Sequence, residues 1–501
     1  MCCAEQPRRR PRFPLEIRAA RTPHAAALVF RAGALPGRAA QSPALTFAQL
    51  ERWTGSIGRS LCGQGVARGE RVGLLLAPGP SYPVVLLSLL RAGAVAVPVS
   101  TRIPDAAVPG LLQRVGCRRL IADPGAPREP IAGLELISAT SLLSADEDPR
   151  GTPATPLPPF DPAADATIVF TSGSTGMPKA ALLAFENHWS SAVGSNCNIP
   201  LRPGDHWLLS LPPWHVGGLS VVFRCLLGGA AIAVARSGEP LAEAIAGLGV
   251  THVSLVATQL YRLLREKRGR AALRSVKAAL LGGGPAPAAL IEEAVHLGVR
   301  LVTSYGSTEM SSQATATRPG DPPETLETAG RPLAFRELSL TAGGEILVRG
   351  RTLFRGYVEE TGVRAARDAS GWFHSGDLGR LDADGRLVVT GRRDTMFISG
   401  GENIHPEEIE RELLRYPGVL AAIVAPVPDP EFGARPVAFL RTATGSPPAD
   451  AELDRFLRMT LPGFKIPRCY LSWPDIEEGM KPDRRSLGAL ARRRFPPNAR
   501  L

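Results

Sequence analysis

The chain has few cysteines in positions where they could act together. Its seven cysteines are scattered, with no Cys-x-x-Cys pair and no Cys/His cluster. Neither a disulfide framework nor a zinc site is therefore indicated. This usage is typical of a reducing compartment, so we expect a cytoplasmic protein.

Long apolar runs, aromatic residues and nucleic-acid motifs are also scarce. The longest apolar stretch, Val84 to Val99, is interrupted by Arg91 and is too short to span a bilayer. The arginine-rich N-terminus has no apolar region behind it, which argues against a secretory signal. Aromatic residues make up 6%, and no RNA- or DNA-binding signature accompanies the net charge of +11. The sequence therefore predicts no membrane span and no nucleic-acid partner, and it leaves a homo-oligomer open.

Length and periodicity predict a multidomain α/β protein. The 501 residues are 44% hydrophobic, enough for a large core and more than one domain. Residues 46–99 alternate between helix and strand signals and predict a βαβ unit in a parallel sheet. Residues 124–165 are rich in Pro, Ala and Asp, which predicts a surface connection between subdomains. We expect a large N-terminal domain over 1–392, made of stacked α/β subdomains and a small β subdomain (337–391), followed by a small mobile α/β domain over 393–501.

The densest group of phosphate-binding residue types follows a predicted strand that ends at Phe170. Glycines there allow close approach of the backbone, while hydroxyls and one ammonium group can donate to phosphate oxygens. The spacing matches neither a Walker A loop nor a nucleophile elbow, and a flexible Gly/Ser linker is the alternative. The predicted phosphate-binding residues are Thr171, Ser172, Gly173, Ser174, Thr175, Gly176 and Lys179.

Five further stretches join this loop in a recognisable order. They are Leu-Pro-Pro-Trp-His-Val-Gly-Gly at 211–218, Ser-Tyr-Gly-Ser-Thr-Glu at 304–309, His-Ser-Gly-Asp-Leu-Gly at 374–379, the Gly-Arg-Arg-Asp stretch at 391–410, and Gly-Met-Lys-Pro-Asp-Arg at 479–484. Together with the loop they resemble the adenylate-forming superfamily, which includes acyl-CoA synthetases, peptide-synthetase adenylation domains and luciferases. The resemblance spans nearly the whole chain.

This resemblance implies an ATP and magnesium site. Tyr305 offers a planar face to a purine, and Gly306 lies beside it. Thr308 and Glu309 present the hard oxygen ligands that Mg²⁺ prefers, although a structural salt bridge is the alternative for Glu309. We expect a tight loop at Glu309 rather than a helix. By resemblance, the adenine pocket wall and the ribose contacts are formed by Gly282, Gly283, Gly284, Pro285, Asp377 and Arg392.

The same resemblance implies a two-step reaction with coenzyme A. A carboxylate would attack the α-phosphate of ATP, and Lys481 with Glu309 and Thr175 would stabilise the charge that develops. A thiol would then attack the acyl-adenylate after the small domain has turned about Asp394. Gly400, Gly401 and Phe464 resemble residues that line the tunnel and nucleotide site for CoA. No carrier-protein attachment motif or condensation module is appended, which disfavours a peptide-synthetase role, and luciferase-like chemistry is rare in the family.

Three local stretches, at 221–224, 253–264 and 431–437, are similar to o-succinylbenzoate:CoA ligases of menaquinone biosynthesis. An aromatic carboxylic acid is then the expected substrate. Arg224 lies in an apolar segment, where an uncompensated charge is costly, so it would pair either with the second carboxylate of that acid or with a protein carboxylate. His215 would gate the acyl pocket or pack in the core.

Two departures and two alternatives accompany this hypothesis. Ala180 stands where the family usually has glycine, and Pro482 follows Lys481, where it restricts the backbone. The alternatives are another aryl- or medium-chain acyl-CoA synthetase and a nucleotide-binding regulator without catalysis. Retention of Lys179, Glu309 and Lys481 argues against the regulator.

Overall fold

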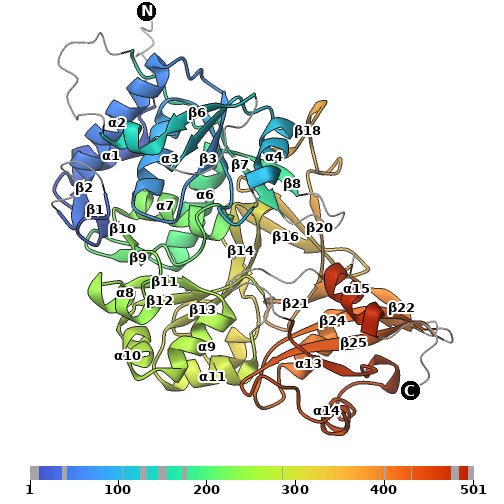
Figure 1. Ribbon diagram of the computed structural model, residues 1–501. Helices are drawn as coiled ribbons and strands as arrows, with labels where there is room; N and C mark the ends of the chain where they lie inside the picture. The colour runs from blue at the N-terminus through green and yellow to red at the C-terminus, as the bar shows by residue number, and fades with distance from the viewer. Residues whose placement is uncertain are drawn as a thin grey trace, which may run out of the picture.

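The computed structural model describes residues 11–35, 42–103, 105–123, 133–144, 155–171, 178–284, 286–393, 395–399, 402–429, 432–474 and 484–494. Two large sheets dominate the upper and lower left parts of the molecule, and the C-terminal elements form a smaller unit at lower right (Figure 1). The expected α/β class is therefore confirmed. No helix in the described ranges combines the length and apolarity needed to cross a bilayer.

The first large sheet has eight strands in the order β19-β18-β8-β7-β4-β3-β5-β6. Strands β3 to β7 run parallel, whereas β8, β18 and β19 complete the sheet in antiparallel pairs. The bounds are β3 Arg71–Leu75, β4 Val95–Pro98, β5 Arg119–Ala122, β6 Glu135–Ser138, β7 Asp165–Thr171, β8 Lys179–Ala184, β18 Gly356–Glu359 and β19 Gly362–Arg364.

The second large sheet has nine strands in the order β15-β14-β13-β12-β11-β9-β10-β1-β2. Strands β1 and β9 to β13 are parallel to their neighbours in this group. The bounds are β1 Ala26–Phe30, β2 Ala44–Thr46, β9 His206–Leu208, β10 Ala231–Val234, β11 His252–Leu255, β12 Ala278–Leu281, β13 Leu301–Ser307, β14 Ser312–Ala316 and β15 Arg331–Pro332.

A layer of helices lies between these two sheets. The largest apolar cluster joins residues of α2, α3, α6 and α7 to both sheets, whereas α8 to α11 cover the outer face of the nine-stranded sheet. The bounds are α1 Pro14–Arg21, α2 Phe47–Gly63, α3 Ser81–Arg91, α4 Val108–Arg114, α5 Ala139–Ser144, α6 Phe185–Asn198, α7 Val216–Gly228, α8 Leu241–Gly247, α9 Ala257–Arg265, α10 Lys267–Ser275, α11 Ala288–His296 and α12 Pro323–Leu326.

Local sequence explains why α2 forms where periodicity predicts it. Thr46 and Gln49 make a capping box, in which the Thr46 hydroxyl accepts from the Gln49 amide and the Gln49 side chain accepts from the Thr46 amide. The predicted apolar face, which includes Trp53 and Ile57, is buried. The βαβ unit of β3, α3 and β4 is likewise confirmed, with β3 and β4 paired in parallel.

The C-terminal part contains three small sheets. A four-stranded sheet has the order β16-β17-β20-β21, a hairpin pairs β22 with β23, and a three-stranded sheet has the order β24-β25-β26. Helices α13 and α14 pack on one face of this last sheet and α15 on the other. The bounds are β16 Arg336–Leu340, β17 Glu345–Gly350, β20 Phe373–Leu381, β21 Leu387–Arg392, β22 Phe397–Ser399, β23 Glu402–Ile404, α13 Pro406–Leu413, β24 Val419–Asp429, β25 Gly433–Thr442, α14 Asp450–Leu457, β26 Tyr470–Ser472 and α15 Arg484–Arg494.

Two expectations about connectivity are wrong. The segment 124–165 is more than a surface connection, because β6 pairs in parallel with β5 and α5 follows directly. The segment 337–391 does not form one β subdomain, because β18 leaves the four-stranded sheet and pairs with β8. Both errors arise because strand pairing depends on partners far away in sequence.

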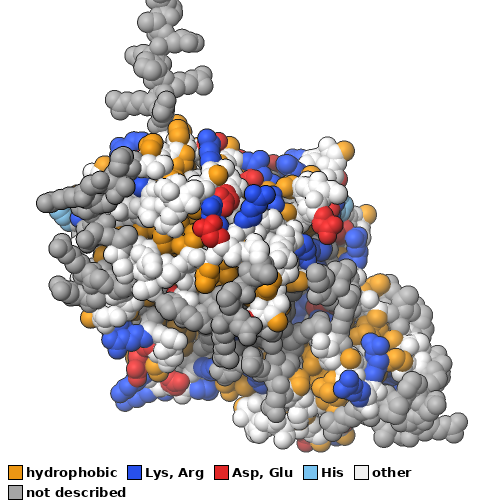
Figure 2. Space-filling model, turned by 45° about the horizontal axis from the view of Figure 1, so that its top comes forward, with side chains coloured by type: hydrophobic (Ala, Val, Ile, Leu, Met, Phe, Trp, Pro, Cys, Tyr) orange, Lys and Arg blue, Asp and Glu red, His pale blue; other side chains and the backbone are white. Residues whose placement is uncertain are grey.

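Charged side chains of both signs are mixed over the described part of the face shown in Figure 2. Exposed ion pairs elsewhere in the structure, such as Arg68 with Asp161 and Arg349 with Glu337, also bring charges of opposite sign together. The excess of basic residues is therefore not gathered into one band on this face.

Candidate active site

The candidate nucleotide site begins at the carboxyl ends of two parallel strands. Leu281, the last residue of β12, is paired with Thr303 of β13, so Gly282 and Ser304 follow side by side. A Cβ on Gly282 would lie 3.2 Å from the Ser304 hydroxyl oxygen, and Gly283 has a left-handed φ of +84°. Ligands of open α/β sheets bind at such carboxyl ends. The predicted Gly282 to Gly284 wall therefore lies next to Tyr305.

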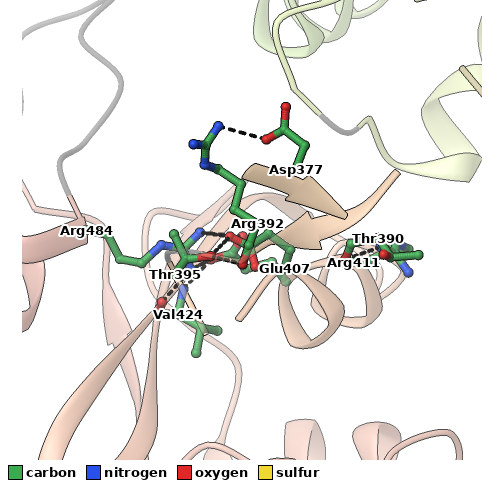
Figure 3. Close-up of polar contacts among 9 residues, drawn as sticks. Asp377, Thr390, Arg392, Thr395, Glu407, Arg411, Val424 and Arg484 are labelled. Carbon is green, nitrogen blue, oxygen red and sulfur yellow. Dashed lines mark hydrogen bonds and ion pairs between the residues drawn. The ribbon is translucent and has the colours of Figure 1, made fainter. Parts of the chain in front are cut away.

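Tyr305, Asp377 and Arg392 form a hydrogen-bonded group. The Tyr305 hydroxyl donates to Asp377 Oδ2 over 2.6 Å, and Arg392 Nη1 donates to Asp377 Oδ1 over 2.7 Å. Asp377 on β20 and Arg392 on β21 are direct cross-strand partners, which explains their contact (Figure 3). Burial, together with the Asp377 carboxylate, raises the pKa of Tyr305. Three residues predicted for the nucleotide are thus adjacent.

A buried carboxylate, Glu345 of β17, supports this group from behind. Its Oε1 accepts from the Gly376 amide over 3.1 Å, and its Oε2 accepts from Arg393 Nη1 over 3.0 Å. His374 Nδ1 lies 3.2 Å from the same Oε2. Because Gly376 precedes Asp377 and Arg393 follows Arg392, Glu345 binds the main chain beside Asp377 and the side chain beside Arg392. Sequence reasoning missed Glu345.

Glu309, Tyr357 and Lys179 form a second group. The Tyr357 hydroxyl donates to Glu309 Oε1 over 2.7 Å, and Lys179 Nζ lies 5.3 Å from the centroid of the Tyr357 ring. The alternative of a structural salt bridge for Glu309 finds no support, since no ion pair involves Glu309 within the described ranges. Burial and the Glu309 carboxylate raise the pKa of Tyr357. Tyr357 was not predicted, because its place beside Glu309 depends on the pairing of β18 with β8.

Glu309 was expected in a tight loop rather than a helix, and it lies in a short helical turn. Thr308–Met310 forms a single 3-10 turn, and Gly306 belongs to β13. A Cβ on Gly306 would lie 1.8 Å from the Ser312 carbonyl oxygen, so packing alone requires glycine there.

The predicted phosphate loop connects two paired strands. Thr171 at the end of β7 is the direct antiparallel partner of Lys179 at the start of β8. A segment that joins partners of one hairpin is not a linker between domains, so the linker alternative is wrong. Several predicted residues lie outside the described ranges: Ser172, Gly173, Ser174, Thr175, Gly176, Pro285, Asp394, Gly400, Gly401 and Lys481.

Arg224 is buried in α7 with a relative exposure of 1%. Its Nη2 donates to Ser312 Oγ and to Gln313 Oε1, each over 3.0 Å, and its guanidinium carbon lies 5.0 Å from the centroid of the Trp207 ring. Its Nε and Nη1 are buried without a hydrogen-bond partner. Burial lowers the pKa of Arg224 to about 10.

No carboxylate in the described ranges forms an ion pair with Arg224. Within these ranges, the alternative that Arg224 pairs with a protein carboxylate is therefore contradicted. A second buried arginine, Arg336, lies nearby. Burial lowers the pKa of Arg336, and the positive charge of Arg224 lowers it further. Two buried cations beside each other favour the entry of an anion. Ser312 is also strained, with a φ of +111°, as residues near ligands often are.

His215 and Phe464 are both exposed to solvent. His215 is the residue before α7, and its ring centroid lies 6.4 Å from that of Trp214. The alternative of a packed core histidine is therefore wrong. The surrounding protein, together with Arg102, lowers the pKa of His215, which favours a neutral ring at physiological pH. Phe464 is 38% exposed on a short 3-10 turn, Gly463–Lys465.

Comparisons with known proteins agree with this geometry. The chain matches the AMP-binding enzyme family over residues 15–358 and the AMP-binding enzyme C-terminal domain over residues 408–478. A 2-succinylbenzoate–CoA ligase of Geobacillus kaustophilus is 35% identical, with 84% of this chain and 88% of that protein covered.

Solved structures give the same result. A variant of E. coli MenE with bound OSB-AMS is 30% identical and superposes with a TM-score of 0.82, covering 96% of this chain and 98% of the other. The o-succinylbenzoate coenzyme A synthetase MenE from Bacillus subtilis, in complex with ATP and magnesium ion, is 30% identical with a TM-score of 0.80, covering 92% and 95% of the two chains. The chain therefore belongs to the AMP-binding enzyme family, in which it groups with the 2-succinylbenzoate–CoA ligases.

Proposed function

We propose that this chain is an AMP-forming acid–CoA ligase that converts 2-succinylbenzoate to 2-succinylbenzoyl-CoA in menaquinone biosynthesis. The reaction passes through an acyl-adenylate and releases pyrophosphate and AMP. Relatives of this name cover most of the chain. The single observation that carries the substrate is Arg224, a buried guanidinium with two unpartnered nitrogens and no carboxylate partner in the described ranges.

ATP binds where the structure gathers the predicted nucleotide residues. Gly283, Gly284 and Pro285 form one wall of the adenine pocket, and Tyr305 beside Gly306 forms another. Asp377 accepts from the ribose hydroxyls, while Arg392 holds its carboxylate in place over 2.7 Å. Asp377 already accepts from Tyr305 and Arg392, so its carboxylate is held in a fixed orientation.

The triphosphate lies along the segment from Thr171 to Lys179. Its hydroxyls and amides donate to the β- and γ-phosphates: Thr171, Ser172, Gly173, Ser174, Thr175, Gly176 and Lys179. Both ends of the segment are held by the pairing of β7 with β8. Lys179 extends from this hairpin toward the Tyr357 ring, so its charge is placed near Glu309. These residues stabilise the departing pyrophosphate.

Magnesium fits the donor set at Glu309. The described ranges contain no cluster of three or more His, Cys, Asp or Glu side chains, so the ion would be held by Glu309 and Thr308 together with phosphate oxygens of ATP. Mg²⁺ is commonly bound in this manner. When bound, it neutralises phosphate charge. Tyr357 orients Glu309 through its 2.7 Å hydrogen bond.

The first step brings two anions together. One carboxylate of 2-succinylbenzoate attacks the α-phosphate, and repulsion between the two anions is severe in a dry site. Lys481 supplies a cation at this point, and His215 borders the acyl pocket. The second carboxylate of the acid pairs with Arg224, which has Nε and Nη1 free to donate. Arg224 thus contributes to both recognition and charge balance.

In the second step the CoA thiol attacks the adenylate. Gly400, Gly401 and Phe464 line the path of the pantetheine arm, and the small domain turns about Asp394 between the steps. We divide the chain into a large domain over 1–392 and a small domain over 393–501. The separate apolar clusters around β24 and β25 support this division. We place the reaction in the cytoplasm on the basis of cysteine usage.

Pyrophosphate release tests the proposal. The protein is incubated with ATP, Mg²⁺ and CoA and with 2-succinylbenzoate, benzoate, 4-phenylbutyrate or octanoate, and pyrophosphate is measured for each acid. We expect release with 2-succinylbenzoate and none above background with benzoate. Turnover of another acid without turnover of 2-succinylbenzoate would contradict the substrate assignment.

A further inference from the structure

The end of β21 is held from outside its own sheet. β21 is the last strand of the four-stranded sheet, in which it pairs with β20, and at its start Leu387 also exchanges two main-chain hydrogen bonds with Ala329 and Gly330. On its open side lies α13. Arg411 Nη2 of α13 donates to the carbonyl oxygens of Val389 and Thr390, over 3.2 and 3.0 Å. A Cβ on Gly391 would lie 3.0 Å from Glu407 Oε2 of the same helix. The path of β21 therefore depends on α13.

Thr395 connects this helix to Arg392. Its hydroxyl lies 2.9 Å from the Arg392 carbonyl oxygen and 2.7 Å from Glu407 Oε1 (Figure 3). A hydroxyl has a single proton, so the donor is shared between the two acceptors. The shorter distance is to the carboxylate, as expected for a charge-assisted bond. Thr395 thus spans from the strand end to α13.

Glu407 is in turn held by α15. Arg484 Nη2 donates to Glu407 Oε1 over 2.9 Å, and Arg484 Nη1 donates to Glu410 Oε1 over 2.7 Å. Glu407 Oε2 is buried without a hydrogen-bond partner. An unsatisfied carboxylate oxygen weakens the fold and so needs an explanation other than stability. Its location against Gly391 indicates that the carboxylate is held there to shape the strand end.

We infer that Thr395 and Glu407 are positioning residues for Arg392. The chain of contacts runs from Arg484 through Glu407 and Thr395 to the Arg392 main chain, and from the Arg392 side chain to Asp377. Because the last link measures 2.7 Å, a displacement of about 1 Å at Arg392 removes it from hydrogen-bond range. In the arrangement of the two domains that the structure describes, packing of α13 and α15 thereby sets the orientation of Asp377.

This inference deepens the proposed function, since it rests on Asp377 as the ribose acceptor of ATP. The nucleotide site then depends on Thr395 even though Thr395 makes no nucleotide contact of its own. Loss of its hydroxyl should weaken ATP binding and loosen the strand end together. If Thr395 contributed to stability alone, loss of its hydroxyl would lower the melting temperature without a selective change in ATP binding or at the end of β21.

Two substitutions of Thr395 and one matched control separate these cases. Thr395→Val removes the hydroxyl and keeps the branched shape, whereas Thr395→Ser keeps the hydroxyl. Thr460→Val is the control, because Thr460 also donates to a glutamate of the same region, Glu412 Oε2, over 2.9 Å.

Calorimetric titration with ATP and Mg²⁺ gives the dissociation constant. Hydrogen exchange of the peptide over 388–396 reports the strand end, where the Arg393 amide donates to the Gly376 carbonyl over 2.7 Å.

We expect Thr395→Val to raise the dissociation constant for ATP by about tenfold, the effect of one net hydrogen bond. Exchange over 388–396 should quicken in that variant, while Thr395→Ser and Thr460→Val stay within about twofold of the unaltered protein. Equal exchange in Thr395→Val and Thr395→Ser would overturn the inference, as would equal loss in Thr460→Val. If the unaltered protein fails to bind ATP, the proposed function fails, and the exchange comparison still decides the role of Thr395.

Discussion

Replacing Arg224 with methionine should remove activity toward 2-succinylbenzoate without weakening the fold. Arg224 has two donors, Nε and Nη1, that no protein group accepts, and a substrate carboxylate would supply a charged acceptor for this guanidinium. Net hydrogen bonds to charged groups contribute about 1.5–3 kcal/mol each. Loss of the pair should cost about 3 kcal/mol, which lowers kcat/KM by about 100-fold.

The same substitution should leave the free energy of unfolding unchanged or raise it by about 1 kcal/mol, because a buried charge without a carboxylate partner opposes folding. Steady-state pyrophosphate release gives kcat/KM for the acid, and urea unfolding gives stability. Arg224→Lys should be intermediate in activity, since lysine keeps the charge and loses the planar fork.

Arg336 provides the matched control. It is also a buried arginine, with Nε donating to the Gln313 carbonyl over 2.5 Å and Nη2 donating to Ser191 Oγ over 2.8 Å. None of its nitrogens is among the unpartnered buried atoms. Arg336→Met should therefore destabilise the protein by about 2–4 kcal/mol, in contrast to Arg224→Met. Arg224→Met with unchanged kcat/KM for 2-succinylbenzoate would refute the assignment of Arg224 to the substrate.

Three further predictions concern the metal, the lysine and the histidines. Glu309→Gln should lower the rate of pyrophosphate release by about 100-fold and raise the Mg²⁺ concentration needed for half-maximal rate, because a neutral amide binds the ion weakly. An unchanged Mg²⁺ dependence would count against Glu309 as a ligand. Lys481→Ala should abolish adenylate formation and leave CoA transfer from supplied acyl-adenylate within about threefold, since the lysine acts only when the two anions meet; normal pyrophosphate release in this variant would remove Lys481 from the first step. Burial lowers the pKa of His252 to about 4 and that of His188 to about 3, so the unfolded chain binds more protons than the folded one between these values and 6.5. Stability should therefore fall as pH drops from 8 to 5, with about 2 kcal/mol from each ring, and urea unfolding of His252→Gln should show a correspondingly smaller loss.

The fold was predictable wherever one segment carries its own signal. The capping box at Thr46 and the apolar face around Trp53 are local, and so are the β-branched run that became β7 and the short apolar run that became β12. The pairing of β18 with β8 was not predictable, because it joins residues near 357 to residues near 181. Propensity shows that a strand forms without showing its partner.

The site was predictable to the same degree. Tyr305, Asp377 and Arg392 were expected at one nucleotide, and the structure brings them into contact. Tyr357 and Glu345 were missed, because an isolated Tyr or Glu in a strand has no distinctive pattern. Their roles become visible only when β18 lies beside Glu309 and β17 lies behind Gly376. Arg224 is a cation without a carboxylate partner in the described ranges. These surroundings likewise could not be predicted without the tertiary structure.

The most direct test of the account is a competition among acids followed by identification of the thioester. Equal concentrations of 2-succinylbenzoate, benzoate and octanoate are mixed with the protein, ATP, Mg²⁺ and CoA, and the acyl-CoA products are identified by mass spectrometry. We expect 2-succinylbenzoyl-CoA as the dominant product, with its adenylate accumulating when CoA is omitted. Formation of another acyl-CoA from the same mixture, with no 2-succinylbenzoyl-CoA, would contradict it.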